Sequence, residues 1–297
     1  MGEIAPFAPA IPAMIVGHAL DGSTPPLGLG EPFALLGGDR LGPDGIPFQV
    51  MHDHQPNFLR WVNQSCDASL AAERFWFRGR TAIFTGWKGA GRTHAARWLA
   101  RCAGVPHVIL NVSDPIIASA VAASGAVSEA LVALPVTTAM AANRCANPIV
   151  NVVGADQASD DVKAGLAVMM DKDAGVYWSE DQLGTCVDLS EVTWVLQVES
   201  AASLLSTIRN EATTVVFSAA PRSFESVFTL SIMLEAMADL GVEPTDPTYA
   251  WSRLKDRLPD YYQLSGKVLY ADMIDALSSL KHVPLPHAHG DPDDVPY

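Results

Sequence analysis

Between about residues 81 and 218, short apolar runs alternate with stretches of helical periodicity. The apolar runs are nearly continuous, which is typical of strands buried on both faces of a parallel sheet. We expect strands at Thr81–Phe84, Val105–Val112, Pro148–Val153, Val192–Val198 and Thr213–Ser218. We expect helices between them at His94–Ala103, Asp160–Met170 and Ala201–Asn210. This alternation predicts an α/β fold in which helices cover both faces of a parallel sheet.

The pattern differs on both sides of this region. Residues 1–55 are rich in Pro and Gly, which indicates an extended arm with little helix, and Asn57–Phe75 has helical spacing with a break near Cys66–Asp67. After Pro221 only helices are expected, at Ser223–Leu240, Pro247–Leu258 and Lys267–Leu280. The predicted units are an arm with a lead-in helix, an α/β domain, a helical lid and a flexible tail, at 1–75, 76–220, 221–282 and 283–297.

A glycine-rich turn follows the first expected strand, in the stretch TAIFTGWKGAGRT. The glycines and the hydroxyl of the phosphate-binding pattern G-x-x-x-x-G-K-[ST] are present at Gly86, Gly89, Gly91 and Thr93. Such a turn directs backbone N–H groups inward, beside the positive end of the next helix. Arg92 stands in place of the lysine, with the same charge but without the compact ammonium geometry.

Trp87 and Lys88 form the tip of this turn. Lys88 joins the glycines, Arg92 and Thr93 as a candidate for nucleotide binding. An exposed Trp87 would serve as an interface anchor or stack on a base, whereas a packed Trp87 would lie against a neighbouring helix. We favour the packed arrangement.

The composition restricts the partners. The chain of 297 residues is 49% hydrophobic and 18% charged, and its net charge is −14 with a pI near 4.8. The acidic balance argues against nucleic acid or an anionic membrane as the main partner. No segment reaches the roughly 18 apolar residues that span a bilayer, so we expect a cytoplasmic protein. Its four cysteines fit no zinc spacing and are expected to be reduced thiols.

Two groups of residues suggest metal binding at first sight. His52 and His54 flank Asp53, but two alternate histidines without a third ligand are usually surface residues. Asp156, Asp160 and Asp161 form an acidic cluster where a helix is expected to begin, and there carboxylates ordinarily act as caps. We predict no metal site from either group.

An α/β domain that begins with a glycine loop and ends in a helical lid resembles the AAA+ family. Within it, the stretch Asn147–Ser200 resembles the ATPase module of Lon-type proteases. The shared features are an Asn-Pro before the third strand, a turn at Asp171–Gly175, an aromatic residue at Trp178 and an Asp-Leu-Ser run at 188–190. The looser resemblance covers about Thr81 to Leu280. It implies a nucleotide site between neighbouring subunits.

The same resemblance identifies altered catalytic positions. In these ATPases the third strand ends in Asp-Glu, which order magnesium and activate water, and here Val153 and Gly154 stand there. Asp156 follows too late in the turn. Where the sensor strand has a polar amide, this chain has Glu199, and Asp156 and Glu199 remain the candidate acids.

Two basic residues correspond to further family positions. The lid arginine is replaced by Lys267, displaced by one place, and Arg209 lies near the position of an arginine finger. We expect ATP or ADP to bind weakly and Mg²⁺ to be poorly held.

The preferred hypothesis is a degenerate AAA+ module, a pseudo-ATPase that acts as a binding, scaffold or regulatory subunit in a homo- or hetero-oligomer. One alternative is a divergent active ATPase that remodels protein or nucleic acid. A second is a sensor that binds a nucleotide or another anion without hydrolysis. The glycine loop by itself is also compatible with a purely structural turn.

Overall fold

The computed structural model describes residues 11–40, 55–87, 89–122, 133–218, 225–241 and 266–280. It divides the chain into two compact units, Met1–Ala219 and Ala220–Tyr297. Within the described ranges, no helix has the length and apolar character needed to cross a bilayer. The finer division into arm, α/β domain, lid and tail stays a prediction.

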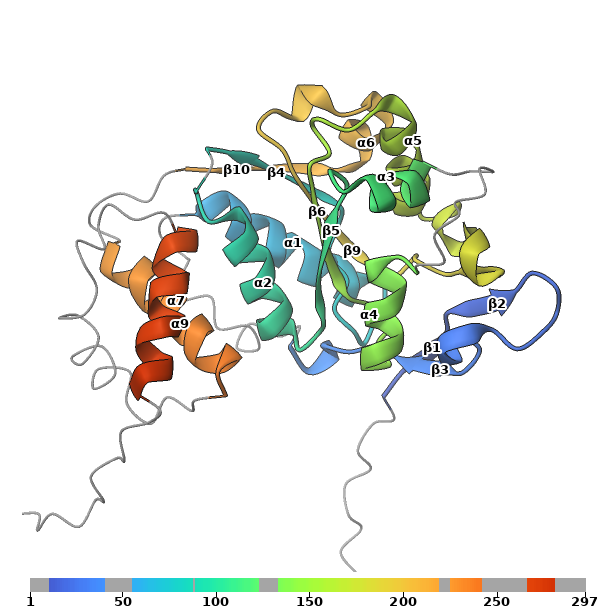
Figure 1. Ribbon diagram of the computed structural model, residues 1–297, viewed down its shortest axis with the longest axis horizontal. Coiled ribbons are helices and arrows are strands. Elements are labelled where there is room, and N and C mark those ends of the chain that lie inside the picture. Colours follow the sequence, from blue (N-terminus) through green and yellow to red (C-terminus); the bar gives the residue numbers. More distant parts are fainter. Residues whose placement is uncertain are drawn as a thin grey trace, which may run out of the picture. The chain divides into compact units, whose positions relative to one another are not determined.

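A five-stranded parallel sheet forms the centre of the first unit (Figure 1). Its strands, in spatial order, are β10 (Thr213–Phe217), β4 (Ala82–Gly86), β9 (Thr193–Gln197), β6 (Ile149–Val153) and β5 (His107–Asn111). Four consecutive residues are buried in each of β4, β6 and β9, because helices cover both faces. The predicted α/β fold class is confirmed, and each strand lies within two residues of its expected ends.

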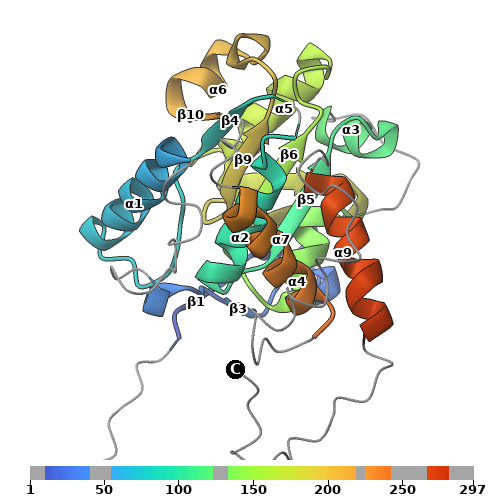
Figure 2. The same ribbon diagram turned by 90° about the vertical axis from the view of Figure 1, so that its left-hand side faces the viewer.

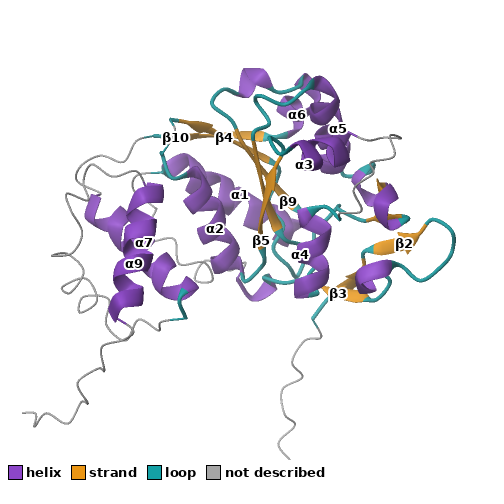
Figure 3. Ribbon diagram, in the orientation of Figure 1, coloured by secondary structure: helices purple, strands orange, loops and turns teal. Residues whose placement is uncertain are grey.

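Helices lie on both faces of this sheet (Figures 1 and 3). One face is covered by α1 (Pro56–Ala71) and α2 (Arg92–Ala103). The other is covered by α3 (Pro115–Ala122), α4 (Pro135–Asn143), α5 (Asp160–Met170) and α6 (Ser206–Glu211). The break expected in the first helix is wrong, because α1 continues through Cys66–Asp67. The helix expected at Ala201–Asn210 is divided into a 3₁₀ turn and α6.

Two small antiparallel sheets accompany the parallel one, and the sequence analysis anticipated neither. β1 (Ala13–Ile15) pairs with β3 (Pro32–Ala34). β2 (Gly17–Ala19) pairs with β8 (Thr185–Val187), which also pairs with β7 (Trp178–Glu180). The described part of the arm is therefore joined to the α/β unit by backbone pairing. Short 3₁₀ helices occur at Pro26–Gly28, Gly38–Arg40, Gly175–Tyr177, Asp181–Leu183 and Ala201–Ser203.

The described part of the second unit consists of two helices, α7 (Glu225–Asp239) and α9 (Gly266–Leu280) (Figure 2). They pack against each other through apolar side chains that include Met233, Leu269 and Met273. The hydroxyl of Tyr270 on α9 also donates to Asp239 on α7. The helix predicted at Pro247–Leu258 lies outside the described residues, as does the expected tail.

Replacing Asn151 with valine is expected to raise the free energy of unfolding by about 1–2 kcal/mol. Asn151 is fully buried in the middle of β6, and neither polar atom of its side chain has a hydrogen-bond partner among the described residues. A buried unpaired amide is costly, and a β-branched side chain suits a central strand. Urea denaturation measures the change.

The matched control for this substitution is Asn111→Val on the neighbouring strand. Asn111 is exposed, and its Oδ1 accepts a hydrogen bond from the backbone N–H of Ser113 at 3.1 Å. We therefore expect no gain in stability there. A loss of more than about 1 kcal/mol in Asn151→Val would contradict the assignment, because it would mean that the amide makes a net favourable contact.

Candidate functional site

The predicted glycine loop connects the carboxyl end of β4 to the amino end of α2. Gly86, Gly89 and Gly91 have φ angles of +136°, +92° and +85°, a region that side chains rarely adopt. A Cβ atom on Gly86 would also lie 2.3 Å from the carbonyl oxygen of Phe217. The loop thus requires glycine in the places that the motif predicts, and Gly91 is the residue that caps α2.

Arg92 is the first residue of α2, and its guanidinium is turned toward the sheet. Its Nη1 donates to the carbonyl oxygen of Val198 at 2.6 Å and lies 3.5 Å from that of Phe84. Val198 directly follows β9, and Phe84 is the third residue of the neighbouring strand β4. Burial lowers the pKa of Arg92, and the carboxylates of Glu199 and Asp156 act in the opposite direction. The group that replaces the phosphate-binding lysine therefore bridges two strands.

Thr93, the motif hydroxyl, is also bound within the chain. Its Oγ1 lies 3.1 Å from Oε1 and 3.0 Å from Nε2 of Gln197, the last residue of β9. Gln197 thus places an amide at the end of β9, whereas Glu199, the residue that the sequence analysis compared with the strand-end amide of the family, is exposed two residues later. The alternation of side chains along the strand could have identified Gln197. It lies two residues after Val195, on the same face of β9, and that face is directed at α2.

The end of β6 carries no carboxylate. Val153 pairs in register with Gln197, and the next residue, Gly154, has φ = +83°. A Cβ atom there would lie 2.1 Å from Oγ of Ser113, so the turn excludes a glutamate side chain at this position. Asp156 is half-buried nearby and acts electrostatically on Arg92. Within the described residues, no three His, Cys, Asp or Glu side chains are grouped so that they could hold a metal ion.

Other predicted site residues lie apart from the loop or outside the description. Arg209 is exposed in the last turn of α6, just before β10 begins, and therefore at the amino end of the sheet. Lys267 is on α9, in the second unit. Lys88 lies outside the described residues, as do His52, Asp53 and His54.

Two further expectations concern residues near the loop. The preferred packed position of Trp87 is wrong, because its side chain is 81% exposed. Asp160 and Asp161 do lie in the first turn of α5 as expected. The cap itself, however, is Ser159, whose hydroxyl oxygen accepts from the N–H of Val162 at 3.4 Å.

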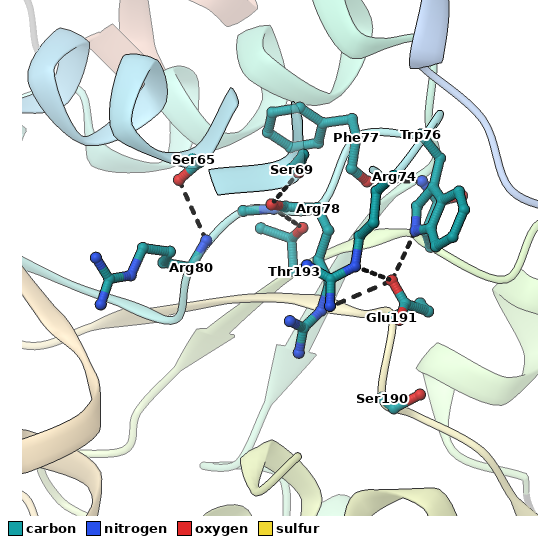
Figure 4. A network of polar contacts seen from close by, with 12 residues as sticks. Ser65, Ser69, Arg74, Trp76, Phe77, Arg78, Arg80, Ser190, Glu191 and Thr193 are labelled. Atoms are coloured by element: carbon teal, nitrogen blue, oxygen red, sulfur yellow. Dashed lines mark hydrogen bonds and ion pairs between the residues drawn. The ribbon is translucent and has the colours of Figure 1, made fainter. Parts of the chain in front are cut away.

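A second group of charged residues, at the amino ends of the strands, is structural (Figure 4). Glu191 Oε2 accepts from Trp76 Nε1 at 2.6 Å and lies 3.9 and 3.8 Å from the Nε atoms of Arg74 and Arg78. Thr193 Oγ1 accepts from the N–H of Gly79 at 2.8 Å. These contacts bind the segment that follows α1 to the start of β9, so they position the sheet rather than form a ligand site.

Comparisons with known proteins add little to this geometry. No protein-family model matches the chain, and no curated protein does. Among solved structures it is similar to RuvB of Thermotoga maritima, a Holliday junction branch migration motor, with 10% identity over 78% of this chain and 74% of that one and a TM-score of 0.38. One mutant of the same protein gives a TM-score of 0.40 at 10% identity, over 80% of this chain and 74% of that one. A second mutant gives a TM-score of 0.39 at 11% identity, over 76% of this chain and 69% of that one. Such low scores assign no function.

Proposed function

We propose that this chain is a degenerate AAA+ module of Lon-like type, a pseudo-ATPase that serves as a binding or scaffold subunit of a larger assembly. The parallel sheet and the glycine loop between β4 and α2 support the AAA+ part of the proposal. The Lon-like part rests on the resemblance of Asn147–Ser200. The proposed subunit would use its fold for protein contacts, in a homo- or hetero-oligomer.

The observation that carries the proposal is the position of Arg92. A phosphate clamp must direct its donors at the ligand, whereas Nη1 of Arg92 is directed at the sheet and donates to the carbonyl oxygen of Val198 at 2.6 Å. Phosphoryl transfer depends almost entirely on positioned charge. With the guanidinium bound to the sheet, the loop lacks the mobile cation that stabilises the transferred group.

The residues present do not fit magnesium. The hydroxyl of Thr93 is bonded to Gln197, and Gly154 has no room for a carboxylate. The carboxylates of Asp156 and Glu199 act electrostatically on Arg92, so a second cation there would be repelled by the guanidinium. Loss of one preorganised group costs roughly 10²–10³ in rate, and here the cation, the metal ligand and the water-activating acid are all altered.

The test is an ATP hydrolysis assay of the full chain with Mg²⁺, on wild type, Arg92→Ala and Arg60→Ala. We expect no turnover that depends on Arg92, and we expect Arg92→Ala to lower the free energy of unfolding by about 1.5–3 kcal/mol, the value of a hydrogen bond from a charged group. Arg60 is exposed on α1, so its removal serves as the control and should change neither quantity. Turnover near 1 s⁻¹, the low end for ordinary enzymes, that disappears in Arg92→Ala would overturn the proposal.

A second candidate function is binding of a nucleotide or small anion without hydrolysis. The positive φ angles of Gly89 and Gly91 favour it, because such a loop directs N–H groups toward one point at the start of α2. Thermal unfolding with ATP, ADP and inorganic phosphate tests this. A ligand at 100 times its Kd should add about 2.7 kcal/mol to the free energy of unfolding, and an unchanged melting temperature with all three would exclude it.

A further inference from the structure

A pocket of about 330 Å³ lies between α5, α6 and the start of β4. Its wall is largely apolar, with Val168, Met170 and Ile208 among the lining residues, and Asp171 and Glu211 add two carboxylates. Ligand pockets measure roughly 300–1,000 Å³ and combine apolar walls with a few polar groups. This pocket is therefore large enough for one aromatic side chain.

Trp87 is the most exposed large apolar side chain in the described part of the chain, at 81%. The carbonyl oxygen of Trp87 accepts a hydrogen bond from the N–H of Ala90 at 3.1 Å. The glycine turn does not need an indole at this position, since its geometry comes from Gly86, Gly89 and Gly91. An exposed indole on a tight turn has the character of an interface anchor.

Trp87 cannot reach the pocket of its own chain. Trp87 follows the carboxyl end of β4, whereas Thr81, which lines the pocket, precedes its amino end. Six residues of extended strand span about 20 Å, much further than a side chain extends. Any contact between the two must therefore join different copies.

We propose that Trp87 of one copy inserts into this pocket of a second copy. This inference deepens and rests on the proposed scaffold function, since it supplies the contact through which the subunit would assemble. The apolar wall matches the body of the indole, whose burial removes roughly 150–250 Å² from water. The indole N–H is only a donor and the carboxylates of Asp171 and Glu211 are acceptors.

The same pairing chemistry already occurs inside this chain, where the indole N–H of Trp76 donates to Glu191 at 2.6 Å. In sequence, Trp87 is followed by Lys88, whose charge is opposite to that of the two pocket carboxylates. Because the donor and the pocket are separate surfaces at opposite ends of β4, each copy can insert one indole and receive another. Repetition of such a contact gives a ring if the rotation closes and a filament if it does not.

The experiment measures the mass distribution of the full chain by sedimentation velocity over a range of concentrations. Wild type should self-associate, and Trp87→Ala should weaken association at least ~30-fold, as loss of an aromatic hot spot does. Val168→Glu, which places a charge at a half-exposed pocket position, should do the same. Phe75→Ala and Ile116→Glu, at exposed positions away from the pocket, are the matched controls and should assemble like wild type.

Mixing the two defective variants gives the sharpest result. Trp87→Ala retains an intact pocket and Val168→Glu retains an intact indole, so the mixture should form dimers and nothing larger. A monomeric wild type, or a Trp87→Ala variant that assembles like wild type, would overturn this inference. Neither result says whether the chain hydrolyses ATP, so the pseudo-ATPase proposal is tested separately by the hydrolysis assay.

Discussion

Replacing Asn147 with alanine is expected to lower the free energy of unfolding by about 4 kcal/mol. Its side chain is fully buried and connects three separate segments. Oδ1 accepts from the N–H of Leu36 at 2.9 Å, and Nδ2 donates to the carbonyl oxygens of Leu36 and Phe77 at 2.9 and 2.8 Å. Removal leaves the Leu36 N–H and the Phe77 carbonyl without this partner, each at a cost of roughly 1–3 kcal/mol.

Two further variants make this prediction specific. Asn147→Asp keeps the acceptor but directs a carboxylate oxygen at two carbonyl oxygens, so it should be at least as destabilising at neutral pH. Asn143→Ala is the matched control, because its exposed Nδ2 donates to the carbonyl oxygen of Ala139 within the same helix, α4. It should change stability by no more than about 0.5 kcal/mol. If urea denaturation gave equal midpoints for Asn147→Ala and Asn143→Ala, the connecting role of Asn147 would be wrong.

The sequence predicted the central parallel sheet but not the small antiparallel sheets. The apolar runs of β4, β6 and β9 predicted the parallel sheet because strands buried on both faces need continuous hydrophobicity. The pairing of β2 with β8 leaves no comparable signal. Each of these strands has three residues, and their partners are more than 160 positions apart in the chain.

Part of the candidate site was likewise predictable from the sequence and part was not. The glycines of the loop were predictable because a local turn needs positive φ, whatever its distant surroundings. The partners of Arg92 and Thr93 were not, because Val198 and Gln197 are brought to the loop only by the insertion of β9 between β4 and β6. Exposure of Trp87 likewise depends on what the rest of the fold places beside the loop, which no local pattern encodes.

The second large effect is a dependence of stability on pH, which we expect from the buried carboxyl group of Glu180. This group packs against the start of α4. Glu180 is the last residue of β7 and is only 6% exposed. The hydroxyl of Thr137 and the N–H of Leu134 donate to its two oxygens, the latter at 3.2 Å. Burial raises the pKa of Glu180 to about 7, despite these two hydrogen bonds, which lower it. The folded protein therefore binds this proton more tightly than the unfolded chain, where the ordinary value is 4.5.

The stability contributed by this protonation is fully present below about pH 4.5 and is lost as the pH rises through about 7. At ~1.4 kcal/mol for each pH unit of the window, we expect the free energy of unfolding of wild type, relative to Glu180→Gln, to fall by about 3 kcal/mol. Urea denaturation of both proteins at half-unit steps from pH 4 to 8 measures this difference, in which the titration of the other carboxylates cancels.

Thr137→Val sharpens the assignment of this pH dependence, because it removes a donor that favours the charged form of Glu180. The loss of stability should then extend to higher pH than in wild type, whereas a purely structural effect of the substitution would shift the whole curve by a constant. A constant difference between wild type and Glu180→Gln across the range would mean that the carboxyl group ionises alike in the folded and unfolded chains. In that case the contact between β7 and α4 would be a charged cap, with no coupling between its proton and the stability of the fold.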